Sequence, residues 1–327
     1  MTSARRTAER VADVGRAMRG GNEVKERTMA SAGFARVVSM LRSTQPRVGD
    51  PLDFERYRRF LTAMAPRPPN GVRVLRTEVS GRTVDWVVPE GADPNVRLLY
   101  LHGGAFIAGS VHTHRALAAR IAEAAGCVGL VVDYRIAPED PFPAALEDCI
   151  AALEYAAHYG PDGTLSEPRC LFVGGDSAGG GLTLSTLIET RGQVPVTAAF
   201  TISAWTDLTC SGESLQTRAA TEPFLAPHLM QPTADAYLGG HDPHDPRASP
   251  LYADLAGLPP LLMQAGDAEI LLDDTRRFAA KARAAGVDVR CEVWPEMFHV
   301  FQAFSTILPE GQEAIASLGA YLREQSA

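Results

Sequence analysis

The stretch Cys170-Leu-Phe-Val-Gly-Gly-Asp-Ser-Ala-Gly179 decides the fold of this chain. Its first four residues are apolar, as in a buried strand, and the residues from Ala178 to Arg191 have the composition of a helix. Between them, Ser177 occupies a sharp strand-to-helix turn flanked by Gly175 and Gly179, where a Cβ would collide with the neighbouring strand or helix. The pattern predicts that the Ser177 hydroxyl projects above a sheet as a nucleophile.

Strands and helices alternate on both sides of this turn. A hairpin is predicted over residues 72–88, with its turn at Ser80-Gly81. Six further strands are predicted at Arg97–Leu101, Cys127–Asp133, Arg169–Val173, Val196–Ser203, Pro260–Ala265 and Asp288–Trp294. Helices are predicted at Arg115–Ala125, Pro143–His158, Ala178–Arg191, Asp273–Ala285 and Gln312–Glu324. Short apolar strands separated by amphipathic helices indicate an α/β fold, with an eight-stranded, mostly parallel sheet that has helices on both faces.

Two segments lie outside this alternation. Residues 1–65 are polar, helical in pattern and interrupted by prolines, and more than fifty residues separate Ser203 from Pro260. A structureless loop of that second length would be unusual. We therefore expect residues 1–65 to be an N-terminal helical cap segment and residues 66–327 to be a catalytic domain with a cap insertion at about residues 207–250.

Composition excludes several classes of protein. The 327 residues are 46% apolar and 21% charged, as in an ordinary globular protein. No apolar run approaches the roughly 18 residues of a membrane span. A net charge of −8, from 31 basic and 39 acidic residues, argues against a nucleic-acid partner. Five widely spaced cysteines and the absence of an apolar stretch after the N-terminal arginines favour a cytoplasmic location.

A second glycine-rich turn, His102-Gly-Gly-Ala-Phe106, follows the strand that ends at Leu101. Such a turn lets backbone N–H groups approach a developing oxyanion, and each donor is typically worth about 2.7–4 kcal/mol in the transition state. The predicted oxyanion hole consists of the N–H groups of Gly103, Gly104 and Ala178. We expect His102 to hold this loop by hydrogen bonds, and Asp176 to support the site beside Ser177.

A serine nucleophile needs a general base and an acid that orients the base. His299, in Phe298-His-Val-Phe301, follows the last predicted strand and is the expected base, because the base comes last in chain order in this kind of site. The strand before it ends in Gly266-Asp-Ala-Glu269, and residue chemistry alone allows either Asp267 or Glu269 to be the acid. No metal site is predicted, since His241-Asp-Pro-His244 is typical of a turn.

Several motifs in chain order together resemble the hormone-sensitive-lipase-like esterases, the bacterial family IV carboxylesterases. They are His102-Gly-Gly-Ala-Phe106, Asp133-Tyr-Arg-Ile-Ala-Pro-Glu139, Gly175-Asp-Ser-Ala-Gly179, Ser203-Ala-Trp-Thr-Asp-Leu208, Ser249-Pro-Leu251 and Phe298-His299. The resemblance covers about residues 70–325. It implies the α/β-hydrolase fold and hydrolysis of small-molecule, short- to medium-acyl esters beneath a helical cap, without a cofactor. Related esterases are often dimers, so the resemblance allows a homodimer.

Two departures from the family pattern matter. Ala105 replaces a third glycine, although its N–H can still donate a hydrogen bond. The family's Asp-x-Leu-x-Asp pattern corresponds here to Glu269-Ile-Leu-Leu-Asp273, which favours Glu269 as the acid and leaves Asp267 as the second choice. The same triad could also serve a lactone hydrolase, an amidase or a deacetylase, and the fold can host a non-catalytic ligand-binding protein.

Overall fold

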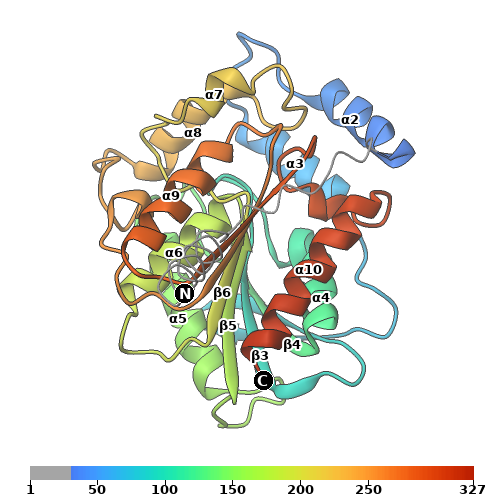
Figure 1. Ribbon diagram of the computed structural model, residues 1–327, viewed down its shortest axis with the longest axis vertical. Coiled ribbons are helices and arrows are strands. Elements are labelled where there is room, and N and C mark those ends of the chain that lie inside the picture. The colour runs from blue at the N-terminus through green and yellow to red at the C-terminus, as the bar shows by residue number, and fades with distance from the viewer. Residues whose placement is uncertain (1–30) are drawn as a thin grey trace, which may run out of the picture.

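An eight-stranded sheet forms the centre of the computed structural model, which describes residues 31–327 (Figure 1). Its strands are β1 (Arg73–Val79), β2 (Arg82–Val88), β3 (Asp93–Leu101), β4 (Cys127–Val132), β5 (Cys170–Asp176), β6 (Ala198–Ile202), β7 (Leu261–Gly266) and β8 (Val289–Trp294). The order is β1-β2-β4-β3-β5-β6-β7-β8; β2 pairs antiparallel with both β1 and β4, and all other neighbouring strands are parallel. The predicted eight-stranded, mostly parallel sheet is confirmed.

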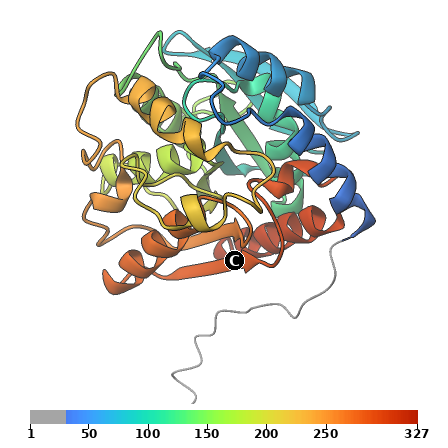
Figure 2. The ribbon, with the colours of Figure 1, turned by 90° about the horizontal axis from the view of Figure 1, so that it is seen from above.

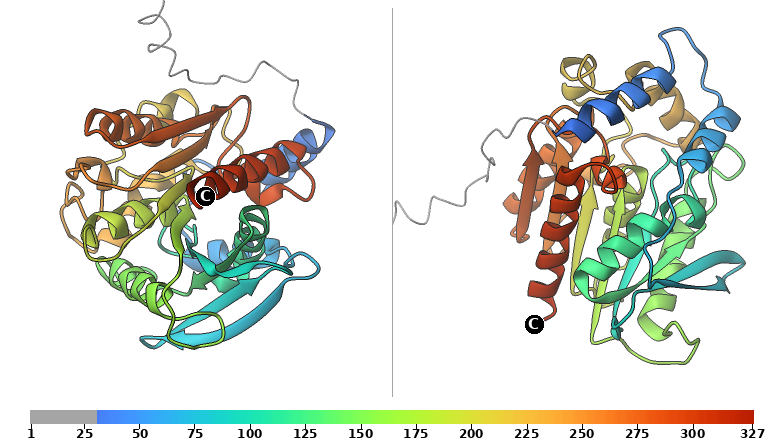
Figure 3. Two further views of the ribbon diagram at one scale, coloured as in Figure 1. Left: turned by 60° about the horizontal axis from the view of Figure 1, so that its bottom comes forward. Right: turned by 90° about the vertical axis from the view of Figure 1, so that its right-hand side faces the viewer.

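Helices cover both faces of the sheet. On one face lie α4 (Val111–Ala125) and α10 (Pro309–Gln325), and on the other lie α5 (Ala144–His158), α6 (Ala178–Glu189) and α9 (Leu272–Ala284), as the left view of Figure 3 shows. Strands buried on both sides need apolar side chains on both, which is why β4 has no exposed residue. Helix α4 begins four residues before its predicted start, because Ser110 and Thr113 form a capping box that apolar periodicity does not reveal.

Further helices lie at the end of the molecule where β5 ends (Figure 2). The N-terminal segment contributes α2 (Ala32–Thr44) and α3 (Phe54–Met64), and the long connection after β6 contributes α7 (Ser214–Thr217), α8 (Pro227–Leu238) and the 3₁₀ turn η1 (Pro250–Tyr252). We call α2, α3, α7 and α8 the cap helices. The remainder of the predicted cap segment lies outside the described residues, and the division into cap and catalytic domain stays a prediction.

One cap helix is tied to the loops that follow the central strands. Arg58 on α3 donates hydrogen bonds to the carbonyls of Ile107 (2.8 Å) and Ala137 (3.0 Å) and pairs with Glu139 at 2.6 Å. This arginine therefore holds α3 above the glycine-rich turn after β3. Across residues 31–327, no helix combines the length and apolar character that crossing a bilayer requires.

Candidate active site

Ser177 lies at the carboxyl end of β5, where α6 begins. Its φ of 54° and ψ of −121° place a non-glycine residue in a strained region of backbone conformation. A Cβ on Gly175 would overlap the carbonyl oxygens of Leu101 and Gly179, and a Cβ on Gly179 would overlap those of Leu101 and His102. The two glycines therefore let β5 and α6 approach β3 closely enough to form this turn.

His299 reaches Ser177 from the loop after β8. Its Nε2 lies 2.9 Å from the Ser177 Oγ, across 122 residues of chain. Both side chains are buried. Burial lowers the pKa of His299 to about 3, so the imidazole is neutral at pH 7 and can accept a proton from the hydroxyl. The structure thus brings together the predicted nucleophile and the predicted base.

Glu269 is buried close to the histidine loop. Its Oε2 accepts hydrogen bonds from the Ser203 hydroxyl (2.7 Å) and the Gly266 N–H (3.1 Å), and the Ser203 Oγ accepts one from the N–H of Val300 (3.1 Å). Ser203 therefore links Glu269 to the residue beside His299. The Glu269 Oε1 and the His299 Nδ1 are both buried without a hydrogen-bond partner in residues 31–327. Burial raises the pKa of Glu269 to about 8.

Asp267, the alternative acid, has different surroundings. It is partly exposed, and its Oδ1 accepts the N–H of Glu296 at 2.6 Å. This bond braces the turn that precedes His299 and engages the backbone rather than the imidazole. Asp267 thus makes a backbone hydrogen bond, whereas Glu269 keeps one buried carboxylate oxygen without a partner in residues 31–327.

The glycine-rich turn differs from expectation at one position. The Gly103 N–H donates to the Asp176 Oδ1 at 3.1 Å, so this N–H is occupied rather than free for an oxyanion. The physical reason is that the buried Asp176 carboxylate requires donors, and it also accepts the Tyr100 hydroxyl at 2.6 Å. By contrast, the N–H groups of Gly104, Ala105 and Ala178 donate to no group within the described part of the chain.

His102 and Asp176 both hydrogen-bond to Gly103 and so hold the glycine-rich turn in place. The His102 Nδ1 donates to the Gly103 carbonyl at 2.9 Å, and its ring stacks on Tyr134 with centroids 4.0 Å apart. Burial lowers the pKa of His102 to about 3, so the ring is neutral. Burial alone would raise the pKa of Asp176, but His114, at 3.4 Å, and the hydrogen bonds that Asp176 accepts hold it below its usual value.

The sequence analysis missed one residue of this site, Glu222. It is buried in the loop between α7 and α8, and its Oε2 lies 3.4 Å from the N–H of His299. A signal for it exists in the sequence, since Glu222 is a lone carboxylate at the start of the apolar run Pro223-Phe-Leu-Ala226. Acidic residues in such runs are rarely buried without a specific set of partners.

An apolar cavity of about 510 Å³ lies between the cap helices and the glycine-rich turn. Residues from both regions line it, among them Phe60 on α3, Ala105 and Ile107 after β3, and Phe224 and Leu225 before α8. The Phe224 ring lies 6.1 Å from the ring of His299. The cavity therefore reaches the glycine-rich turn at Ala105, and its wall residue Phe224 lies beside His299, although neither Ser177 nor His299 lines it.

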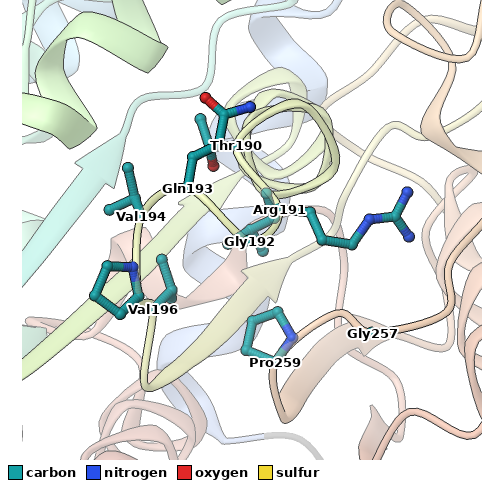
Figure 4. Close-up of a pocket in the computed structure, with 10 residues that line it drawn as sticks. Thr190, Arg191, Gly192, Gln193, Val194, Val196, Gly257 and Pro259 are labelled. Carbon is teal, nitrogen blue, oxygen red and sulfur yellow. The ribbon is translucent and has the colours of Figure 1, made fainter.

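A second cavity, of about 310 Å³, lies before the amino ends of β6 and β7 (Figure 4). Thr190, Arg191, Val196 and Pro259 are among the residues that line it, at the end of α6 and before β6 and β7. None of the candidate catalytic residues contributes to it. Of these two cavities, the first is the one lined by a residue of the glycine-rich turn, Ala105.

Comparison with known proteins shows which family the chain belongs to. Residues 98–303 match a family described as having the alpha/beta hydrolase fold. An acetyl-hydrolase of Streptomyces hygroscopicus is 45% identical over 243 residues, which cover 74% of this chain and 79% of the relative. An esterase of Acinetobacter venetianus is 35% identical over 227 residues, or 68% of this chain and 73% of the relative.

Solved structures extend the similarity to nearly the whole chain. The esterase EstE5, in crystals soaked with p-nitrophenyl butyrate, has a TM-score of 0.85 and 38% identity over 91% of this chain and 99% of its own. An esterase from the bacterial hormone-sensitive lipase family has a TM-score of 0.84 and 41% identity, over 92% of this chain and 100% of its own. The chain therefore belongs to the α/β-hydrolase family and, within it, to the hormone-sensitive-lipase-like serine carboxylesterases.

Proposed function

We propose that this enzyme hydrolyses short- to medium-acyl esters through an acyl-enzyme formed on Ser177. The observation that carries the proposal is the 2.9 Å contact between the Ser177 Oγ and the His299 Nε2 on a strained strand-to-helix turn. In this geometry His299 takes the hydroxyl proton as the oxygen attacks the ester carbonyl. It then gives that proton to the leaving alcohol, and water releases the acid by the same route.

Glu269 is the proposed acid of the triad. Its Oε1 and the Nδ1 of His299, neither of which has a partner among residues 31–327, are an acceptor and a donor buried on loops that Ser203 connects. When His299 becomes an imidazolium, a bond between these two atoms compensates both buried charges. Burial disfavours either charge alone, as the raised pKa of Glu269 and the lowered pKa of His299 indicate.

The proposed oxyanion hole consists of the N–H groups of Gly104, Ala105 and Ala178. Their lack of other partners supports this choice, as does the position of Ala178 at the N-terminus of α6, where the helix dipole favours negative charge. Gly103 has a different role in this proposal, because its N–H anchors the loop to Asp176.

The cap cavity is the proposed acyl or alcohol subsite. Its volume of about 510 Å³ and its apolar lining suit a chain of several carbons, with the ester placed near Ala105. The relative named as an acetyl-hydrolase adds acetyl esters to the candidate substrates. The same constellation could cleave lactones or amides, and turnover of matched lactones and acetamides separates those activities from ester hydrolysis.

The test is hydrolysis of p-nitrophenyl acetate, butyrate, octanoate and palmitate by the wild type and by Ser177→Ala. We expect turnover of the shorter esters, weak turnover of palmitate, and a loss of about three or more orders of magnitude in the variant. A folded wild type that turns over none of these esters, lactones or amides would overturn the proposal in favour of a ligand-binding protein.

A further inference from the structure

A buried carboxylate from the cap lies against the two loops that carry the proposed base and acid. Glu222 is 2% exposed, in the segment that connects α7 to α8. It is far in sequence from both loops, since Glu269 follows β7 and His299 follows β8. Charged side chains are seldom buried without a dedicated set of partners, so the surroundings of this carboxylate need an explanation.

Within residues 31–327, every hydrogen-bond partner of the Glu222 carboxylate is a backbone N–H. Its Oε1 accepts from Phe224 (2.7 Å) and Leu225 (3.3 Å), and its Oε2 accepts from His299 (3.4 Å). The N–H of Ile270, directly after Glu269, also hydrogen-bonds to this carboxylate. A group surrounded only by donors must act as an acceptor at both oxygens. A carboxylate does so, whereas an amide of the same shape has only one accepting atom.

These contacts connect three parts of the site. Phe224 and Leu225 line the cap cavity, Ile270 adjoins the proposed acid, and His299 is the proposed base. We infer that Glu222 is a positioning residue that fixes the histidine and acid loops to each other and to the wall of the substrate cavity. The inference rests on the proposed function, because it concerns the alignment of that same triad.

Two opposing effects act on the pKa of the Glu222 carboxyl. Burial raises the pKa of Glu222 to about 7, although the backbone hydrogen bonds act in the opposite direction by favouring the ionised form. The Glu222 charge also contributes to the raised pKa of Glu269. The two carboxylates are thus close enough to interact, and each has a separate set of donors.

The test compares Glu222→Gln with Glu222→Asp, because the two changes separate shape from hydrogen-bond acceptance. Gln keeps the volume of Glu but replaces one acceptor with an amide donor that faces N–H groups. Asp loses a methylene but keeps both acceptors. We expect Glu222→Gln to lower kcat/KM for p-nitrophenyl acetate by about 10- to 100-fold, mainly in kcat, since a misplacement of about 1 Å can have that effect. Glu222→Asp should stay within about fivefold of the wild type.

A second readout is the rate at which an organophosphonate modifies Ser177, which reports the Ser–His pair with little contribution from the cap cavity. This rate should fall in Glu222→Gln by the same factor as kcat for acetate. The control is Glu213→Gln, an exposed position in the same insertion, which should match the wild type. Thermal unfolding of each variant gives the folded fraction to which all rates are normalised.

Three outcomes would overturn the inference while the wild type remains active. One is a Glu222→Gln enzyme within twofold of Glu213→Gln, and another is a Gln variant more active than the Asp variant, which would indicate packing alone. The third is a rise in KM for octanoate with unchanged phosphonylation, which would restrict Glu222 to the cavity wall. If Glu222→Gln does not fold, Glu222→Asp and Glu222→Asn compare a carboxylate with an amide on side chains of equal length. An inactive wild type would instead remove the proposed function itself.

Discussion

The part of the site at the ends of the sheet strands and the part formed by the cap are held together by different kinds of contact. Around Ser177, backbone approaches backbone, and a Cβ at Gly175 or Gly179 would overlap carbonyl oxygens of neighbouring elements. In the cap, side chains make the contacts instead. For example, the rings of Phe60 and Phe224 pack with centroids 6.1 Å apart on the wall of the cavity. The backbone contacts around Ser177 tolerate almost no substitution, whereas substitutions in the cap can change the shape of the cavity.

This difference teaches how one fold can keep its chemistry and vary its substrates. Catalysis requires the nucleophile, base and oxyanion donors to be held within a fraction of an ångström, which rigid backbone contacts provide. Substrate preference requires only a cavity of suitable size, which apolar side chains on separate helices provide. Changes on the sheet side should therefore alter the rate of the chemical step, and changes in the cap should alter the preference among esters.

The largest expected effect concerns the acid on the sheet side. Glu269→Gln should lower kcat by about 10³- to 10⁴-fold, because a neutral amide neither stabilises the imidazolium of His299 nor fixes its tautomer. Asp267→Asn should stay within about tenfold of the wild type, since its Oδ1 braces only the turn at Glu296. Steady-state kinetics with p-nitrophenyl acetate give both values. The reverse ranking would move the acid to Asp267.

The two halves also differ in how far sequence could predict them. The glycines around Ser177 and the position of His299 after the last strand are local patterns with a steric or topological cause, so they could be predicted. The partner of the Gly103 N–H could not, because it depends on where the buried Asp176 carboxylate points after folding. The one sequence signal for Glu222 is its place before an apolar run, which does not reveal its hydrogen bonds to the loops at Ile270 and His299.

The next effect concerns stability and compares one glycine from each half. Gly179→Ala should lower the free energy of unfolding by about 1–3 kcal/mol or more, because its Cβ would meet the backbone oxygens of Leu101 and His102. Gly212→Ala, in the cap insertion, should have a smaller effect, since the nearest atom is the Asp273 Cβ at 3.3 Å. Urea unfolding of both variants measures the difference. Equal losses would show that the sheet side is no tighter than the cap.

A third effect concerns three buried carboxyl groups, those of Glu222, Glu269 and Asp274. Burial raises the pKa of Glu222 and of Asp274 to about 7, and that of Glu269 to about 8. A folded-state pKa above the unfolded one means that the folded protein retains protons which the unfolded chain has released. The stability that these groups contribute should therefore be greatest below about pH 4. It should be lost as the pH rises from there through 7 to 8.

The slope is about 1.4 kcal/mol per pH unit for each proton retained. Asp274→Asn is the variant of choice, because one oxygen, Oδ1, accepts both the Thr206 and Asp207 N–H groups, and an amide oxygen can do the same. This variant should reduce the decline in stability between pH 5 and 7 relative to the wild type. Urea unfolding at several pH values measures it, and an unchanged slope would show that Asp274 is ionised throughout this range.

The smallest expected effect lies within the cap. Phe60→Ala removes one wall of the cavity, so kcat/KM for p-nitrophenyl octanoate should fall by about 3- to 10-fold, the equivalent of about 0.7–1.4 kcal/mol of lost apolar contact. The acetate ester, which fills less of the cavity, should be affected less, and the rate of Ser177 phosphonylation should change least. Met40→Ala, at a side chain that is 41% exposed on α2 and outside the cavity lining, is the control. If acetate and octanoate lost equal factors in Phe60→Ala, the cap would act on the chemical step, and the two halves of the site would not be separable.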